Sequence, residues 1–91
     1  MIEFEWNDDF GKAEVGAYRI EVLCIRTQNY HLYLCRDDQD LVFQRCGADN
    51  DQDAERQAVR LAFAFLHQEQ EKLQKAAAIC GAYILQLKEG E

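Results

Sequence analysis

The sequence lacks proline and serine altogether, and Thr27 is its only threonine. Without serine, the chain cannot use a serine nucleophile, which excludes one whole class of catalyst. The four cysteines form no Cys-x-x-Cys pair, so the closely spaced ligands of a typical zinc site are missing. The five glycines form no phosphate-binding loop. These absences predict a protein that is not an enzyme and that holds no cofactor and no metal.

Long apolar runs are absent as well. None approaches the roughly 18 residues that a membrane span needs, and the N-terminus is acidic, unlike that of a signal peptide. We therefore expect a cytoplasmic protein that does not associate with membranes. In that compartment Cys24, Cys35, Cys46 and Cys80 should be reduced thiols, each packed among apolar neighbours as a small hydrophobic side chain.

Basic residues are few. The 91 residues include 17 Asp and Glu against 10 Lys and Arg, which gives a formal net charge of −7. Such a surface repels a phosphate backbone, so direct binding of nucleic acid is not expected. The charge suits a basic protein partner, or it serves solubility alone. The hydrophobic fraction of 48% is that of an ordinary globular chain of one domain, covering residues 1–91.

The first half of the chain alternates apolar and polar residues in short runs, which is typical of strands in a sheet with one buried face. Polar turn sequences of two to six residues separate these runs, so neighbouring strands should be antiparallel. We expect a meander of three to four strands within residues 2–46. The strands are predicted at Ile2–Trp6 (resumed at Ala13–Val15), Tyr18–Arg26, Tyr30–Arg36 and Leu41–Cys46.

The second half carries one amphipathic helical pattern, which predicts a helix over 52–88 that packs across one face of the sheet. Asn50 or Asp51 is suited to be its N-cap. Only Glu69 is polar in the middle of the apolar stripe, and Gly81 is the only glycine of the run. At about 100° per residue one arc contains Ala54, Ala58, Leu61, Ala62, Phe65, Leu66, Leu73, Ala76, Ala77, Cys80, Tyr83, Ile84 and Leu87.

This helix is too long for the sheet. A straight helix over 52–88 spans roughly 55 Å, whereas a nine-residue strand spans roughly 30 Å. The surplus stripe must be covered, because monomers rarely expose an apolar patch of that size. We predict a homodimer with Leu73, Ala77, Cys80, Ile84 and Leu87 at its interface. Two alternatives stay open: a break within 68–72 with a fold-back, or an end at Gly81 followed by an added strand over 83–87.

Two other patterns resemble metal or catalytic sites incompletely. The run Asp49–Asp53 matches the start of a calcium-binding loop, but Ala54 replaces the glycine of its sixth position and Arg60 replaces the glutamate of its twelfth. His31 and Cys35 share a strand face but lie roughly 13 Å apart, too far to chelate one ion without help. A cysteine nucleophile needs a histidine near it in space, and His31 with Cys35 or Cys24 is a conceivable pair, but histidines among strands are more often ordinary surface or edge residues. Helix capping and sheet packing explain these residues without a metal.

A further pattern resembles small phage and prophage proteins. It consists of a tryptophan in the first strand, a Gly-x-Tyr-x-Ile start of a following strand, and an acidic start of an alanine-rich helix. Here these are Trp6, Gly16–Ile20 and Asp53–Ala62, so the resemblance covers about residues 4–70. Such proteins often have a lysine after the first helix alanine, where this chain has Glu55 and Arg56, and they lack its long C-terminal segment.

Some small acidic phage proteins are similar to anti-CRISPR or anti-restriction inhibitors, which occupy basic nucleic-acid sites of host enzymes. The resemblance therefore implies an inhibitor of a bacterial nucleic-acid-directed defence complex, acting in the host cytoplasm. Acidic turns at strand ends would meet the basic partner surface. The expected partner-binding residues are Asp37, Asp38, Asp40, Asp49, Asp51 and Asp53. The alternative is a cytosolic interaction module such as a toxin-immunity protein or a small chaperone.

Overall fold

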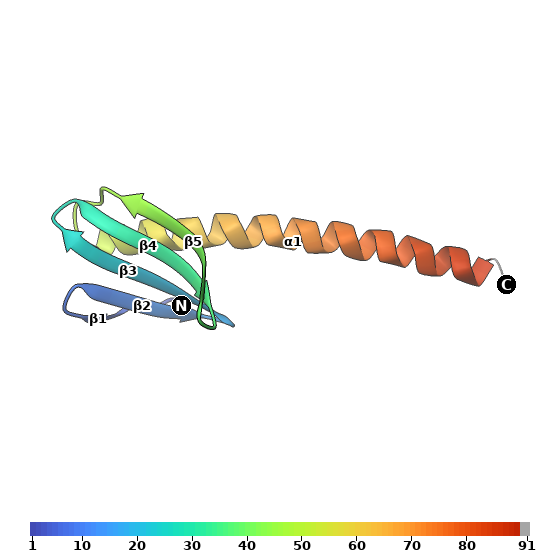
Figure 1. Ribbon diagram of the computed structural model, residues 1–91, viewed down its shortest axis with the longest axis horizontal. Coiled ribbons are helices and arrows are strands. Elements are labelled where there is room, and N and C mark those ends of the chain that lie inside the picture. The colour runs from blue at the N-terminus through green and yellow to red at the C-terminus, as the bar shows by residue number, and fades with distance from the viewer. Residues whose placement is uncertain (90–91) are drawn as a thin grey trace.

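The computed structural model describes residues 1–89 as five strands followed by one helix (Figure 1). The strands pair in the order β1-β2-β3-β4-β5, each antiparallel to the next. The predicted α+β fold, a meander followed by a long helix, is confirmed, with five strands in place of three to four. The elements are β1 (Glu5–Asn7), β2 (Phe10–Val15), β3 (Tyr18–Arg26), β4 (Asn29–Arg36), β5 (Gln39–Cys46) and α1 (Asp51–Glu89).

Tight two-residue turns join all five strands. One residue of each turn has a left-handed backbone: Asp8, Gly16, Gln28 and Asp37 have φ between 55° and 60°. Turns with positive φ match the right-handed twist of paired strands, and Gly and Asp adopt that conformation more readily than most residues. These turns keep consecutive strands adjacent and leave the acidic pairs Asp8–Asp9 and Asp37–Asp38 at the sheet ends.

The extra strand comes from the N-terminal segment, where the sequence prediction was wrong in detail. The predicted strand Ile2–Trp6 is shorter and shifted, because β1 pairs only with the first three residues of β2. Gly11, which lies between the two predicted strand segments Ile2–Trp6 and Ala13–Val15, is inside β2 and opposite Trp6. A Cβ atom built on Gly11 would meet the Trp6 ring at 2.5 Å, so the indole occupies the space that any larger residue would need.

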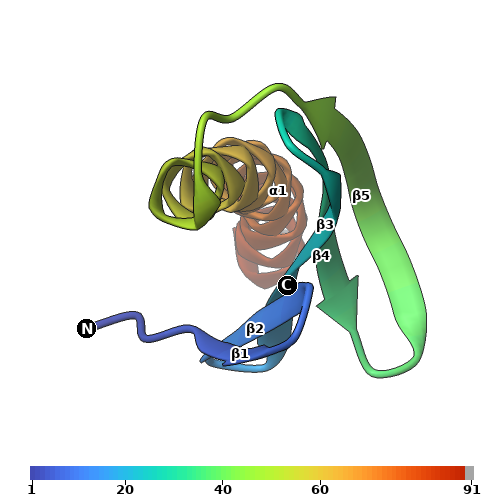
Figure 2. The ribbon, with the colours of Figure 1, turned by 90° about the vertical axis from the view of Figure 1, so that its left-hand side faces the viewer.

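Helix α1 and the inner face of the sheet form one core. The sheet curves round the first half of the helix (Figure 2). Inward side chains of β3 and β4, among them Ile20, Val22, Leu32 and Leu34, are at most 1% exposed. The helix contributes the small residues Ala54, Ala58 and Ala62, which are at most 3% exposed. Alanine allows the helix axis to approach the sheet closely, and Val59, Leu61, Phe65 and Leu66 pack round this contact.

The helix continues for 39 residues without interruption. Residues 68–72 are helical and so are residues 83–87, so the fold-back and the added strand are both wrong for this structure. Without proline, the only weak position is Gly81, and one glycine costs a helix about 1 kcal/mol, too little to end it here. The molecule is therefore elongated, with extents of 65 × 23 × 20 Å.

Candidate functional site

The two predicted acidic clusters lie at opposite ends of β5. Asp37, Asp38 and Asp40 belong to the β4–β5 hairpin at the N-terminal end of this strand. Asp49, Asp51 and Asp53 follow its C-terminal end and start the helix. Eight residues of strand separate them by roughly 25 Å. The structure therefore does not bring the six aspartates together into one patch.

Hydrogen bonds at the helix start occupy the second cluster. The backbone N–H of Asp53 donates to Asn50 Oδ1 at 2.8 Å, which identifies Asn50 as the N-cap. Asp53 Oδ2 accepts from the Asp49 backbone N–H at 3.3 Å and from Gln57 Nε2 at 3.2 Å. The Tyr30 hydroxyl donates to Asp51 Oδ1 at 2.7 Å, and this bond, together with burial, raises the pKa of Tyr30. Asp53 therefore stabilises the helix start, and Asp51 joins that start to β4.

The hairpin cluster is free by comparison. Asp37 and Asp38 are exposed, and among the described residues neither side chain has a hydrogen-bond or ion-pair partner. Asp40 accepts a hydrogen bond from Cys35 Sγ at 3.2 Å. Burial of this thiol, its bond to Asp40 and the nearby negative charge of Glu21 raise the pKa of Cys35 to about 12. Asp37 and Asp38 are thus available for a partner, whereas Asp40 also has a local role.

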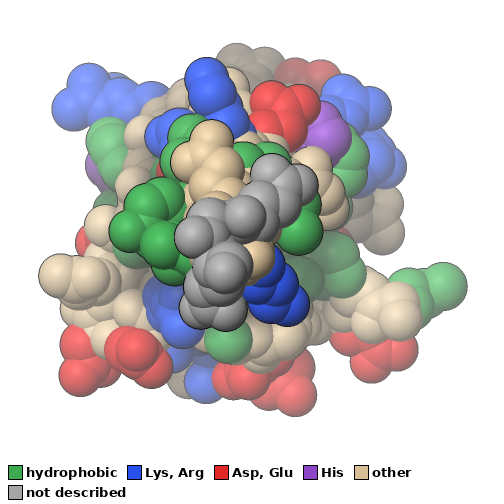
Figure 3. Space-filling model, turned by 90° about the vertical axis from the view of Figure 1, so that its right-hand side faces the viewer, with side chains coloured by type: hydrophobic (Ala, Val, Ile, Leu, Met, Phe, Trp, Pro, Cys, Tyr) green, Lys and Arg blue, Asp and Glu red, His purple; other side chains and the backbone are tan. Residues whose placement is uncertain are grey.

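A third acidic group escaped the sequence prediction. Glu3, Glu5 and Glu14 line one hollow at the β1–β2 edge of the sheet, together with Lys12. Figure 3 shows acidic side chains along the lower rim of this end of the molecule. Only the pairing of β1 with β2 brings Glu3 and Glu5 near Glu14, because eight residues lie between Glu5 and Glu14 in the chain. The alternation of Glu3 and Glu5 with apolar residues was the sequence signal that could have indicated this acidic edge.

The outer face of the sheet carries an aromatic cluster that strand register assembles. His31 and Tyr33 of β4 lie beside Phe43 of β5, with ring centroids 5.1 Å (His31 to Phe43) and 5.2 Å (Tyr33 to Phe43) apart. Phe43 is 47% exposed, and Ile25 on β3 is 46% exposed. Aromatic side chains on an open face are frequent anchors of protein–protein contacts.

Groups with metal-binding or catalytic chemistry are already satisfied by one another. Glu21, Cys35 and Asp40 place their ligand atoms within 4.8 Å of one another. Cys35 is 1% exposed, and its thiol donates a hydrogen bond to Asp40 Oδ1 at 3.2 Å. Arg19 Nε also lies 2.6 Å from Glu21 Oε2. The four cysteines are free thiols, and His31 contacts aromatic rings.

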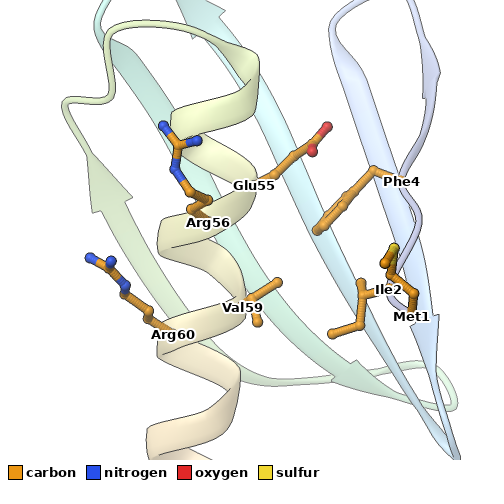
Figure 4. Close-up of a pocket in the computed structure, with 7 residues that line it drawn as sticks. All are labelled: Met1, Ile2, Phe4, Glu55, Arg56, Val59 and Arg60. Carbon is orange, nitrogen blue, oxygen red and sulfur yellow. The ribbon is translucent and has the colours of Figure 1, made fainter.

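A shallow apolar hollow of about 430 Å³ lies between the N-terminal segment and the helix (Figure 4). Ile2, Phe4 and Val59 point toward one another across it, while Arg56 and Arg60 extend away on the other side of the helix. Its carboxylate, Glu55, accepts a hydrogen bond from Trp6 Nε1 at 2.6 Å. The hollow therefore has no convergent reactive groups, and we treat it as a seam of the fold.

The predicted dimer residues all lie on the free part of α1, beyond the sheet. Every residue from Gln70 to Cys80 is exposed, and so is every residue from Ala82 to Lys88. Leu73 is 71% exposed, Tyr83 61%, Ile84 53% and Leu87 52%. Figure 3 shows apolar side chains round the near end of the helix. The dimer stays a prediction. The apolar surface that it requires is exposed on the second half of α1.

None of the described helices is long and apolar enough to cross a membrane. Comparison of the chain with models of known protein families, with curated proteins and with solved structures finds no match.

Proposed function

We propose that this protein is a non-enzymatic inhibitor of phage type, which occupies a basic surface of a bacterial nucleic-acid-directed defence complex in the cytoplasm. The observation that carries the proposal is the pair of exposed carboxylates Asp37 and Asp38 on the β4–β5 hairpin, which have no partner among the described residues, in a chain of net charge −7. A groove that holds nucleic acid is rich in Lys and Arg, and exposed carboxylates compete with phosphates for it.

The geometry favours the hairpin over the helix start as the contact. Asp49, Asp51 and Asp53 have fixed roles in capping and in holding the helix. Asp37 and Asp38 lie on a tight turn that is fixed by the β4–β5 ladder. Carboxylates on a rigid turn lose little conformational entropy when a partner binds. Glu3, Glu5 and Glu14 extend the negative charge to the opposite edge of the sheet.

The outer sheet face favours a second candidate, a protein-interaction module such as a toxin-immunity protein. His31, Tyr33 and Phe43 form an aromatic centre there, and charged residues surround it: Arg19 and Glu21 on β3, Arg45 on β5. An apolar centre with a polar rim is the usual anatomy of a protein–protein interface. In this candidate, hydrophobic contact rather than charge would dominate the affinity.

The decisive experiment measures phage plating on bacteria that carry a CRISPR or restriction system and express this protein. We expect the wild type to restore plating and the double variant Asp37→Lys with Asp38→Lys to lose this effect. The purified protein should bind the affected complex with an affinity that falls steeply between 0.1 and 1 M salt, because the Debye length shrinks from about 10 Å to about 3 Å. The variant should associate about tenfold more slowly.

The chain offers a matched control. Asp8 and Asp9 form another exposed two-residue turn, with φ of 55° at Asp8 as at Asp37. Asp8→Lys with Asp9→Lys makes the same change in net charge at the opposite end of the sheet. Equal effects of the two double variants would contradict a specific role of the hairpin. Loss of activity in Tyr33→Ala with Phe43→Ala, combined with salt-independent binding, would favour the second candidate.

A further inference from the structure

The second half of α1 has an apolar stripe with no partner in its own chain. The helix leaves the sheet after Leu66, and residues 70–88 extend it by about 28 Å. Leu66, Leu73, Cys80 and Leu87 recur every seven residues, the spacing of a helix–helix seam. Leu66 packs against the core, whereas Leu73, one heptad later, is 71% exposed.

The phase of this stripe restricts what covers it. Ala58 and Ala62 face the sheet, and the stripe continues from them along the same side of the helix. The sheet lies beside the first half of the helix (Figure 1), and therefore on the same side as the exposed stripe further along. A second helix that packs on the stripe lies in the same layer as the sheet, because both cover the same side of α1. Its end therefore meets the end of the sheet near Leu66.

We infer that a second copy of this chain covers the stripe in antiparallel orientation. In a parallel pair, the two sheets would both need the space between the paired helices. In an antiparallel pair, each sheet lies beyond the C-terminal end of the other helix. The sheet of one chain and the helix of the other then lie end to end without a clash. Such a two-fold arrangement buries the same stripe in both chains.

A hollow at the junction of sheet and helix lies where the end of the partner helix arrives. It is lined by Leu41, Phe65 and Leu73, with the charged residues Asp37, Glu69 and Arg36 at its side. If the overlap is centred near residue 78, Leu73 lies opposite Tyr83 of the second copy. Leu87 and Lys88 of the second copy then lie at the level of Glu69. Lys88 is the basic residue of the last helical turn, so its charge is opposite to that of Glu69, which also lies 3.4 Å from Lys72 of its own chain.

Small residues in the middle of the overlap allow close approach. Ala76, Ala77, Cys80 and Gly81 occupy the central turns, where large side chains would hold the helices apart. Leu73, Tyr83, Ile84 and Leu87 lie towards the two ends of the overlap, while Ile79, which is 65% exposed, lies at the edge of the stripe near its centre. This distribution fits a two-fold axis near residue 78.

The apolar surface that the two helices can bury sets the expected affinity of the dimer. At roughly 100 to 200 Å² for each large side chain, the exposed parts of Leu73, Tyr83, Ile84 and Leu87 and the small residues between them amount to roughly 450 Å² per chain. A total of roughly 900 Å² is typical of weak, reversible complexes. We expect a dissociation constant on the order of 10 μM.

Small-angle X-ray scattering of the wild-type protein tests the arrangement directly. The single chain is 65 Å long. An antiparallel dimer that overlaps over residues 70–88 should show a maximum dimension of about 100 Å, whereas a parallel dimer keeps about the length of one chain. A monomer at 500 μM, or a dimer without the longer dimension, would overturn the inference.

Charge exchange tests the register. Only the antiparallel pair brings Glu69 next to Lys88 of the second copy. Glu69→Lys and Lys88→Glu should each weaken the dimer roughly fivefold, since the two-fold axis repeats the contact, and the double variant should regain the wild-type dissociation constant. Gln74→Lys, on the far side of the helix, is the control and should leave the constant unchanged. Additive weakening in the double variant would contradict this register.

The inference does not depend on the proposed inhibitory function. Leu73→Asp with Leu87→Asp should give a folded monomer by light scattering and circular dichroism, because both side chains are already exposed in the single chain. An unchanged dimer in this variant would contradict the interface. The same variant in the plating assay shows whether inhibition needs the dimer, and either result there leaves the scattering result standing.

Discussion

The two halves of α1 carry the same stripe in the same phase but make different use of it. In the half that lies on the sheet, the buried positions are the alanines 54, 58 and 62. In the free half, the stripe contains Leu73, Tyr83, Ile84 and Leu87, each more than half exposed. The difference teaches that alanine lies where the helix touches the sheet most closely, with Leu61, Phe65 and Leu66 packed round that contact, whereas the large residues beyond the sheet stay exposed.

The largest expected difference between the halves comes from one substitution made in each. Ala58→Asp places a carboxylate at a position that is 1% exposed, without a partner, and should lower the free energy of unfolding by about 4 kcal/mol or more. A small domain is stabilised by only about 5–15 kcal/mol, so much of this variant should be unfolded. Urea denaturation followed by circular dichroism measures the loss.

Ala77→Asp is the matched change in the free half. Its carboxylate stays in water in the single chain, so we expect a change within about 0.5 kcal/mol at concentrations too low for self-association. A large destabilisation of this monomer would mean that residues 70–88 do not stand free of the sheet.

Alkaline pH should destabilise the sheet through Cys35 and Tyr30, which both belong to β4. The pKa of Cys35 is raised from 9.0 to about 12 in the folded protein, so the thiol contribution is complete below pH 9 and is lost as the pH rises from 9 towards 12. At pH 10.5 the free energy of unfolding should be about 2 kcal/mol lower than at pH 7.5. Tyr30, whose pKa is also raised, adds to the loss above pH 10.

The control for this pH profile is Cys35→Ala, which should flatten the decline between pH 9 and pH 10. The bond between Tyr30 and Asp51 remains in that variant, so the loss above pH 10 should persist in part. An identical slope for both proteins over the whole range would show that the thiol does not carry the effect.

The smallest expected effect concerns the helix start. Asn50→Ala removes the acceptor of the Asp53 backbone N–H and should lower the free energy of unfolding by about 1 kcal/mol. Gln70→Ala, in the free half, should change it by less than about 0.5 kcal/mol. Thermal unfolding of dilute protein compares the two, and equal effects would mean that the cap does not limit the stability of the core.

The strands β3, β4 and β5 could be predicted from the sequence because alternation of apolar residues is a local signal. The first hairpin could not be. Gly11 alone suggests a turn, because glycine is frequent in turns. Its place opposite Trp6 depends on the register between β1 and β2, which the sequence of one strand does not determine. The length of α1 followed from its unbroken pattern and the absence of proline, while the course of its second half needed the structure.

The candidate surfaces divide in the same way. The sequence by itself determined the excess of acidic residues, their place in turns, and the apolar stripe, since charge and periodicity are properties of the chain. Only the tertiary structure decided that Asp49, Asp51 and Asp53 are engaged in holding the helix while Asp37 and Asp38 are free, and that His31, Tyr33 and Phe43 meet. Hydrogen bonds and cross-strand neighbours join residues distant in the chain, and the packing of the whole sheet against α1 selects them.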